Sequence, residues 1–258
     1  VICSDKTGTL TQNKMTVTES WSMGGAQART MINEIAVLCN DSSSGRQSPT
    51  ETAIYDMALE AGVNARALER ENLRISEKPF DSSRKLMSVV VSGAHGRRQL
   101  TKGAPEVLLA SCTRYLSPDG VRPLDRETRA EIERSNAAMC DRALRVIGFG
   151  YREAGGTIIE SDMIFAGLAG MLDPPRPEAA EAVRRCRSAG IRPVMITGDH
   201  KNTAVAIARQ LGIFGARSVC MTGAQLDALS DEQLMTQVER VSVFARVSPA
   251  HKLRIVRA

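Results

Sequence analysis

The C-terminal third of the chain alternates short apolar runs with helical patterns, and this alternation restricts the possible folds more than any other feature. The apolar run at 191–197 predicts a buried strand. Apolar residues at helical spacing precede it at 178–189 and follow it at 202–211, and each predicted helix ends at a glycine, Gly190 or Gly212. Further strands and helices are predicted in the same alternation at 218–221, 230–240, 241–245 and from Pro249. Such alternation is typical of a parallel sheet with helical crossovers.

The middle of the chain predicts antiparallel pairing instead. Two strand candidates, 85–92 and 97–102, are separated by the short segment Gly93-Ala94-His95-Gly96, which is typical of a hairpin. Further strands are predicted at 145–152 and 164–172. Helical patterns lie among these strands, at 30–39, 49–61, 105–111 and 126–144. This part of the chain therefore predicts an α+β arrangement.

Residues 1–4 form one more apolar run, which predicts another buried strand. The simplest arrangement is a parallel α/β domain formed by residues 1–16 and 173–258, with an antiparallel α+β domain, 17–172, inserted into it. We therefore expect an α/β fold whose outer domain has a Rossmann-like parallel sheet and is discontinuous in sequence.

The composition narrows the classes of function. Apolar residues make up 43% and charged residues 24%, which are ordinary values for a folded globular chain. The formal net charge of +5 is compatible with an anionic partner such as a nucleotide. One Trp, three Tyr and five Phe leave few rings for stacking on bases, and the basic residues are dispersed, so we expect no nucleic-acid partner.

Two further features, a transition-metal site and a membrane-spanning helix, are also disfavoured. The six cysteines form no C-x-x-C motif and have no histidine at metal-ligand spacing, so no transition-metal site is predicted. The longest apolar run, 163–172, is about half of the roughly 20 residues that a membrane-spanning helix requires. We therefore expect no transmembrane segment in these residues.

The sharpest chemical motif is Asp5-Lys6-Thr7-Gly8-Thr9-Leu10-Thr11, directly after the strand predicted at 1–4. Ligands bind at the carboxyl ends of the strands in an open parallel sheet, so reactive groups are expected at this place. A carboxylate there can attack a phosphoryl group and form an acyl phosphate. The neighbouring hydroxyl groups and Gly8 offer contacts to phosphate oxygens. If the aspartate stood alone, an Asp-Lys turn that caps a helix would be the better explanation.

The motif resembles the phosphorylation motif of P-type cation-transporting ATPases, which belong to the haloacid dehalogenase superfamily. Further segments resemble motifs of this family in the same order along the chain: Phe80-Asp81 with Arg84-Lys85, Lys102-Gly103-Ala104-Pro105-Glu106, Asp173-Pro174-Pro175-Arg176, Thr197-Gly198-Asp199, and Arg246 with Lys252. The resemblance spans residues 5–252. It implies a phosphorylation domain of the haloacid dehalogenase type with an inserted nucleotide-binding domain.

By this resemblance, ATP binds the insert and its γ-phosphoryl group is transferred to Asp5, with ATP and Mg²⁺ as the expected cofactors. The implied catalytic residues are Asp5, Lys6, Thr7, Thr197, Gly198 and Lys252. The implied Mg²⁺ ligands are the Asp5 carboxylate and the backbone carbonyl of Thr7. The implied nucleotide-binding residues are Glu51, Phe80, Lys85, Lys102, Gly103, Arg145, Asp173, Arg176, Asp199 and Arg246.

Physical chemistry supports these roles, although each residue by itself has a simpler explanation. Phe80 can stack on adenine, but a phenylalanine beside a strand is more often part of the core. Lys252 can neutralise charge that develops near Asp5, but a lysine on a helix usually faces solvent. Glu51 lies in Ser48-Pro49-Thr50-Glu51, which also predicts a capping box with a proline in the first helical turn.

Other helix starts follow from the same rules. Ser230 with Gln233 predicts a capping box, and Ser248 before Pro249 predicts an N-cap followed by a proline at the first helical position. His200 is expected to be a helix-entry residue, and no catalytic role is assigned to it.

The residue two positions after Asp5 distinguishes the pumps from the phosphatases. Phosphatases of this superfamily carry a second Asp there as general acid and base, and this chain has Thr7. Without that acid the aspartyl phosphate should persist, which favours an ion-translocating ATP hydrolase. The alternatives are a soluble phosphatase with a large cap and a non-catalytic nucleotide-binding module. The expected cation is Ca²⁺, because the motifs at Phe80, Lys102 and Asp173 most resemble those of calcium pumps.

The resemblance also implies parts outside these 258 residues. The Gly-Asp-Gly-x-Asn-Asp motif of the family follows the Lys252 position and does not occur before Ala258. We therefore expect the phosphorylation domain to be C-terminally truncated and poorly active by itself. The expected partners are the transmembrane helices and actuator domain of the pump, with the transported cation bound outside this region. The region is expected to be soluble at the cytoplasmic face of a membrane.

Overall fold

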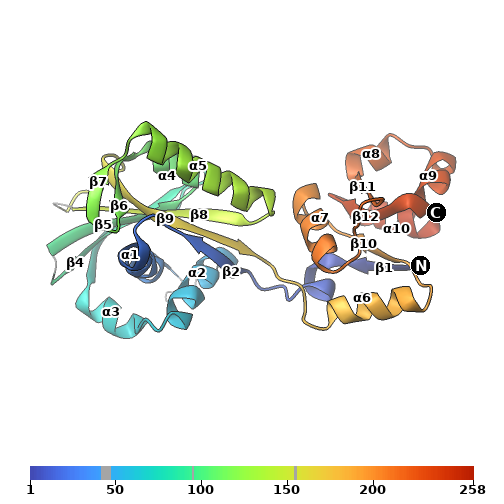
Figure 1. The fold of residues 1–258 in the computed structure, drawn as a ribbon, viewed down its shortest axis with the longest axis horizontal. Helices are drawn as coiled ribbons and strands as arrows, with labels where there is room; N and C mark the ends of the chain where they lie inside the picture. Colours follow the sequence, from blue (N-terminus) through green and yellow to red (C-terminus); the bar gives the residue numbers. More distant parts are fainter. Residues whose placement is uncertain (42–47, 95, 154–155) are drawn as a thin grey trace. The chain divides into compact units, whose positions relative to one another are not determined.

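The computed structural model describes residues 1–41, 48–94, 96–153 and 156–258 (Figure 1). These residues form two compact units. Unit 1 consists of Val1–Lys14 and Asp173–Ala258, and unit 2 consists of Met15–Leu172. The two ends of the chain thus build one unit, and the middle of the chain builds the other. The predicted hairpin loop includes His95, which lies outside the described residues.

Unit 1 contains a four-stranded parallel sheet among its described residues, with strand order β1 (Ile2–Asp5), β10 (Pro193–Ile196), β12 (Val241–Ala245) and β11 (Val219–Thr222). The helical segments of this unit are η1 (Lys6–Leu10), α6 (Ala179–Ser188), α7 (Lys201–Gln210), α8 (Gly223–Asp227), α9 (Asp231–Gln237), η3 (Val238–Arg240) and α10 (Pro249–Arg257). The parallel sheet predicted from the alternating pattern is therefore confirmed. The apolar side chains of β10, β12 and the facing helices form the core of this unit.

One expectation for this sheet is wrong. The first strand was expected to be buried, but Val1 is 75% exposed and Ile2 is 45% exposed. The reason is that β1 lies at an edge of the described sheet and pairs only with β10 there.

Unit 2 contains an eight-stranded sheet, in which seven strands follow the order β3 (Leu73–Lys78), β4 (Leu86–Gly93), β5 (Gly96–Gly103), β8 (Arg145–Glu153), β9 (Met163–Leu172), β6 (Cys112–Ser117) and β7 (Gly120–Pro123). The remaining strand, β2 (Thr16–Trp21), also pairs with β9. The β4–β5 hairpin is antiparallel, as predicted. The sheet is not wholly antiparallel, because β6 and β9 run parallel.

The helices of unit 2 are α1 (Gly25–Leu38), α2 (Pro49–Glu60), α3 (Ala65–Glu71), α4 (Pro105–Ala110) and α5 (Arg126–Asp141). All of β9 is buried, and the fully buried ring of Phe149 on β8 packs in the same core as α1 and α2. α5 ends before the predicted boundary at residue 144, because Ala143 has a φ of +62° that a helix does not accommodate. Of the helices in the described part of the chain, none is long and apolar enough to span a membrane.

The predicted helix starts in unit 1 are confirmed. Ser230 and Ser248 each accept a hydrogen bond from the backbone N–H three residues later, and both form capping boxes. His200 precedes α7, and its side chain accepts the N–H of Asn202 at 3.3 Å. These side chains satisfy N–H groups that have no partner within the helix.

Replacing Phe149 with Ala should destabilise unit 2 by about 3–5 kcal/mol, because the change opens a large cavity in a packed core. Replacing Phe80 with Ala should change the free energy of unfolding by only about 0.5 kcal/mol or less, because this ring is 62% exposed. Denaturant unfolding of both variants checks the difference. Equal destabilisation by the two changes would contradict the described positions of the rings.

Candidate functional site

Unit 1 brings the predicted catalytic segments to one edge of its parallel sheet. Asp5 ends β1 and is paired in register with Ile196 of β10, so Thr197 and Gly198 follow at the same level. Arg246 follows the end of β12, the next strand of the sheet. The carboxyl ends of parallel strands lie at the same edge, and ligands of open sheets bind there. The loops after these three strands therefore form a candidate reaction site.

The carboxylate of Asp5 forms an ion pair with the ammonium group of Lys252, which lies on α10. The two side chains are 42% and 38% exposed, so the pair is accessible to solvent. Asp5 makes no side-chain capping bond to the helical segment that follows it. The helix-cap explanation of Asp5 is therefore wrong, and Lys252, although partly exposed, is paired with this carboxylate. A cation beside this carboxylate is suited to neutralise negative charge that develops there.

Lys6 is 4% exposed, and its burial organises the start of the same motif. Its ammonium group lies 2.5 Å from the carboxylate of Asp199 and 3.7 Å from that of Asp173. The hydroxyl group of Thr11 also donates a hydrogen bond of 2.5 Å to Asp173. Because a buried ammonium group requires carboxylate partners, Lys6 ties the loop after β1 to the loops after β9 and β10.

Hydrogen bonds to backbone atoms hold the other predicted residues of this edge. The Thr197 hydroxyl accepts the N–H of Asp199 at 3.1 Å, and the N–H of Arg246 donates to the Asp199 carbonyl at 2.9 Å. The Arg176 guanidinium donates to the Gly8 carbonyl at 3.1 Å. Gly8 has a φ of +75°, which glycine adopts without the strain of a side chain. These contacts connect the loops into one network.

Two predicted residues of this edge, Thr7 and Gly198, are exposed. Thr7 has extended dihedral angles inside η1 and interrupts its helical geometry. Its backbone carbonyl and the Asp5 carboxylate are both oxygen donors within the same short loop. Asp173, Arg176, Asp199 and Arg246 were predicted to contact nucleotide, and the structure places all of them in unit 1 with the catalytic candidates.

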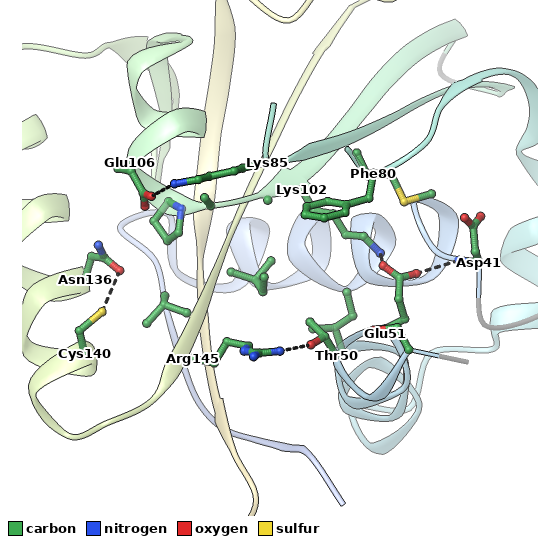
Figure 2. Close-up of a pocket in the computed structure, with 18 residues that line it drawn as sticks. Asp41, Thr50, Glu51, Phe80, Lys85, Lys102, Glu106, Asn136, Cys140 and Arg145 are labelled. Atoms are coloured by element: carbon green, nitrogen blue, oxygen red, sulfur yellow. Dashed lines mark hydrogen bonds and ion pairs between the residues drawn. The ribbon is translucent and has the colours of Figure 1, made fainter. Parts of the chain in front are cut away.

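Unit 2 contains a pocket with a volume of about 820 Å³ (Figure 2). Residues from separate segments that were predicted to bind nucleotide line it together: Glu51, Phe80, Lys85, Lys102, Gly103 and Arg145. Small-molecule sites usually have volumes of roughly 300–1,000 Å³, so the pocket is large enough for a nucleotide.

The best-buried charged group of this pocket is Lys102 on β5. Its ammonium group pairs with Glu51 on α2, and the two side chains are 6% and 16% exposed. Glu51 also accepts the N–H of Asp41 at 2.8 Å. The capping box predicted at Ser48 is wrong, because the Glu51 carboxylate binds these two groups and Ser48 makes no capping bond. Burial raises the pKa of the nearby Cys39 thiol to about 11, so the thiol stays neutral beside the ion pair.

The remaining predicted residues surround the pocket with an aromatic ring and further cations. Phe80 is 62% exposed and lines the pocket, so the explanation of this ring as core is wrong. The Lys85 ammonium lies 3.6 Å from the carboxylate of Glu106, and the Arg145 guanidinium donates to the Thr50 hydroxyl at 3.0 Å. Figure 2 shows these groups on different sides of one hollow. The arrangement suits a ligand that is anionic at one end and aromatic at the other.

Gly103 allows two segments of the pocket wall to approach closely. A Cβ atom at this position would lie 2.2 Å from the Lys85 carbonyl oxygen, which is closer than real atoms approach. The same carbonyl accepts the N–H of Ala104 at 3.0 Å. The glycine thus lets the ends of β4 and β5 converge beside Lys102.

Some pocket residues were not predicted as site residues: Asp41, Thr50, Met87, Glu106, Asn136 and Cys140 are among them. A sequence signal existed for part of this set. Asn136 and Cys140 are four residues apart within a predicted helix and therefore share a face. Nothing in the sequence indicates that this face of α5 lies across the pocket from α2.

Comparisons with known proteins agree with the motifs. A family model described as P-type ATPase, cytoplasmic domain N, matches residues 26–178, more than half of the chain. The chain therefore belongs to the P-type ATPase family.

Among curated relatives, the calcium-transporting ATPase 1 of Bacillus cereus is 42% identical over the whole chain. The calcium-transporting ATPase of Bacillus subtilis is 40% identical, and the probable cation-transporting ATPase F of Mycobacterium tuberculosis is 37% identical, again over the whole chain. The chain spans only about a third of the length of these relatives, from 31% to 34%.

Replacing Glu51 with Gln should destabilise unit 2 by up to about 3 kcal/mol, because it leaves the buried Lys102 ammonium without its carboxylate. The matched control is Glu106→Gln, which removes the partner of Lys85. Since the Lys85–Glu106 pair is 55% and 63% exposed, the control should cost about 0.5 kcal/mol or less. Thermal unfolding of both variants measures the effect. Comparable losses would contradict the different burial of the two pairs.

Proposed function

We propose that this chain is the nucleotide-binding and phosphorylated part of an ATP-driven calcium pump. In this proposal, unit 2 is the nucleotide-binding domain and unit 1 is a phosphorylation domain of the haloacid dehalogenase type. The observation that carries the proposal is the pocket of unit 2, where residues predicted from separate motifs, including Phe80, Lys102 and Arg145, line one hollow. The names of the relatives support calcium as the transported ion.

In the pocket, the exposed face of Phe80 stacks on the adenine ring. Lys85, Lys102 and Arg145 offer positive charge to the triphosphate, and Gly103 lines the pocket between β5 and α4. The Lys85–Glu106 ion pair is exposed, so Lys85 can exchange Glu106 for a phosphate group at little cost. The pocket thus supplies contacts for both ends of ATP.

In unit 1, a carboxylate oxygen of Asp5 attacks the γ-phosphorus of ATP. A bond forms between this oxygen and phosphorus, the bond to the bridging oxygen breaks, and ADP leaves with the electron pair of that bond. Lys252, paired with Asp5, offsets negative charge that gathers on the transferring group. Thr197 and the backbone at Gly198, which follow β10 at the same strand edge, hold the phosphoryl oxygens in this proposal.

The residues present suit Mg²⁺. Among the described residues there is no cluster of three or more His, Cys, Asp or Glu side chains that could enclose a metal. Mg²⁺ does not need one, because it is commonly held by one or two protein oxygens together with water and substrate phosphates. The Asp5 carboxylate, 42% exposed, and the Thr7 carbonyl would provide these oxygens. When bound, the ion neutralises charge on the phosphate oxygens.

The reaction would stop at an aspartyl phosphate. Thr7 offers no carboxyl group that could act as general acid and base for its hydrolysis, unlike the second aspartate of related phosphatases. Persistence of the phosphorylated state suits a pump, in which transmembrane helices and an actuator domain respond before hydrolysis. The chain would then work at the cytoplasmic face of a membrane, and the cation would bind elsewhere in the pump.

ATP should bind the 258-residue chain, and Phe80→Ala should weaken this binding about tenfold, consistent with a stacking loss of ~1–3 kcal/mol. The matched control is Leu73→Ala, since Leu73 is an apolar residue of similar exposure, 64%, that does not line the pocket. Calorimetric titration measures both affinities. No binding by the folded chain, or equal losses in both variants, would contradict a nucleotide site in this pocket.

In the complete pump, ATP labelled at its γ-phosphate should transfer its label to the protein, and Asp5→Asn should abolish this labelling. Asp231→Asn is the control, because this carboxylate is exposed on α9 and should not affect labelling. Acid-quenched gels measure the label. Rapid hydrolysis of small phosphate esters without a stable label would favour the soluble phosphatase, and ATP binding without any label would favour a non-catalytic module.

A further inference from the structure

We propose that Glu160, in the segment between β8 and β9, is a positioning residue that holds the turn carrying Phe80 in place for nucleotide binding. The inference rests on the proposed function of the pocket. Glu160 itself does not line the pocket. It acts from the other face of the β4–β5 hairpin, through Arg84.

The carboxylate of Glu160 is 11% exposed and has partners from three directions. Its Oε1 accepts a hydrogen bond of 2.8 Å from the Ser88 hydroxyl and pairs with the guanidinium of Arg84. Its Oε2 pairs with the Lys78 ammonium at 3.0 Å. A carboxylate enclosed in this way lies in one fixed position, and it fixes the groups that surround it.

Arg84 transmits this position to the pocket. Its second terminal nitrogen donates to the backbone carbonyl of Pro79, the residue directly before Phe80. The two terminal nitrogens of the Arg84 guanidinium thus bind the Glu160 carboxylate and the Pro79 carbonyl. The backbone that presents the exposed ring of Phe80 is attached to the sheet through this contact.

The turn between Phe80 and Arg84 closes around Asp81. The carboxylate of Asp81 accepts the N–H groups of Ser83 at 2.9 Å and of Arg84 at 3.0 Å, and its carbonyl accepts the N–H of Lys85 at 2.6 Å. The Ser83 hydroxyl, which also donates to this carboxylate, and these N–H groups hold the pKa of Asp81 below its ordinary value. These hydrogen bonds are local to the turn. The guanidinium group of Arg84 connects the turn to Glu160.

The register of the sheet places Glu160 behind the pocket. Lys78, Ser88 and Thr101 are cross-strand partners in one row over β3, β4 and β5. Met87 and Lys102 form the neighbouring row, and both line the pocket. Adjacent residues of a strand point to opposite faces, so Glu160 contacts the face that does not form the pocket.

A second contact anchors the segment of Glu160 on that face. The N–H of Ile159 donates to the buried side chain of Gln99 at 2.8 Å, and Gln99 in turn binds the Thr101 hydroxyl at 3.2 Å. The segment is therefore attached to β5 by Gln99 and to β4 by Ser88.

Fixing this turn matters because the Phe80 ring is largely exposed. A ring that is 62% exposed is not held by packing, and ordering it upon binding reduces affinity. The Glu160–Arg84 pair orders the backbone below the ring in advance. We therefore expect loss of the Glu160 carboxylate charge to lower the affinity for ATP through the Phe80 contact. The effect on the free energy of unfolding should be smaller.

The first test is hydrogen–deuterium exchange of the 258-residue chain without ligand, comparing wild type with Glu160→Gln. Peptides covering 80–86 should exchange at least fivefold faster in the variant, because the hydrogen bonds of the intact turn protect the amides of Ser83, Arg84 and Lys85 from exchange. The matched control is Glu34→Gln, since Glu34 forms a comparable ion pair of 2.9 Å with Arg98. The control should leave 80–86 unchanged. Unchanged exchange of 80–86 in Glu160→Gln would overturn the proposal.

The second test is a double-mutant cycle on ATP affinity. Glu160→Gln should weaken ATP binding about three- to tenfold when Phe80 is present and less than twofold when Phe80 is replaced with Ala. Equal weakening in both backgrounds would mean that Glu160 acts on the fold in general, which overturns a positioning role. Absence of ATP binding by the wild-type chain would refute the proposed nucleotide site, and exchange of 80–86 would then decide by itself whether Glu160 holds the turn.

Discussion

A buried ammonium group needs a carboxylate partner, and both candidate sites are organised around such a pair. In unit 1, the nearly buried Lys6 brings Asp199 and Asp173 to the loop that begins with Asp5. In unit 2, the nearly buried Lys102 brings Glu51 of α2 to the β4–β5 hairpin. Each pair joins segments that are far apart in the chain. In each unit, the buried ion pair therefore fixes the segments that lie next to the exposed reactive or binding groups.

The sheets determine which side chains meet at these points. The parallel sheet of unit 1 places the loops after β1, β10 and β12 at one edge, so Asp5, Thr197 and Arg246 come together. In unit 2, the antiparallel register of β4 and β5 places alternate cross-strand pairs on opposite faces of the hairpin. Met87 and Lys102 line the pocket, while Ser88 on the opposite face binds both Thr101 and Glu160. A shift of one residue would exchange the two faces.

The types of most long elements could be predicted from the sequence, because their apolar periodicity is strong. The parallel units after residue 178, the β4–β5 hairpin, the capping box at Ser230 and the N-cap at Ser248 are confirmed. Short elements such as α3, β3 and β7 carry too few residues for a clear period and were not predicted. The parallel pairing of β6 with β9 joins distant segments, so no local pattern could indicate it.

The sequence by itself determined the class of the protein, because the motif at Asp5 and the later motifs occur in an order that the P-type ATPase family shares. It also determined which residue types could meet a phosphate or an aromatic base. Only the tertiary structure decided the partners of these residues: Lys252 for Asp5, Glu51 for Lys102 and Glu160 for Arg84. These pairs join residues from distant segments of the chain, and the energy of a charge depends on its burial and neighbours. Such pairs follow from the packing of the sheets and helices, and local sequence does not encode them.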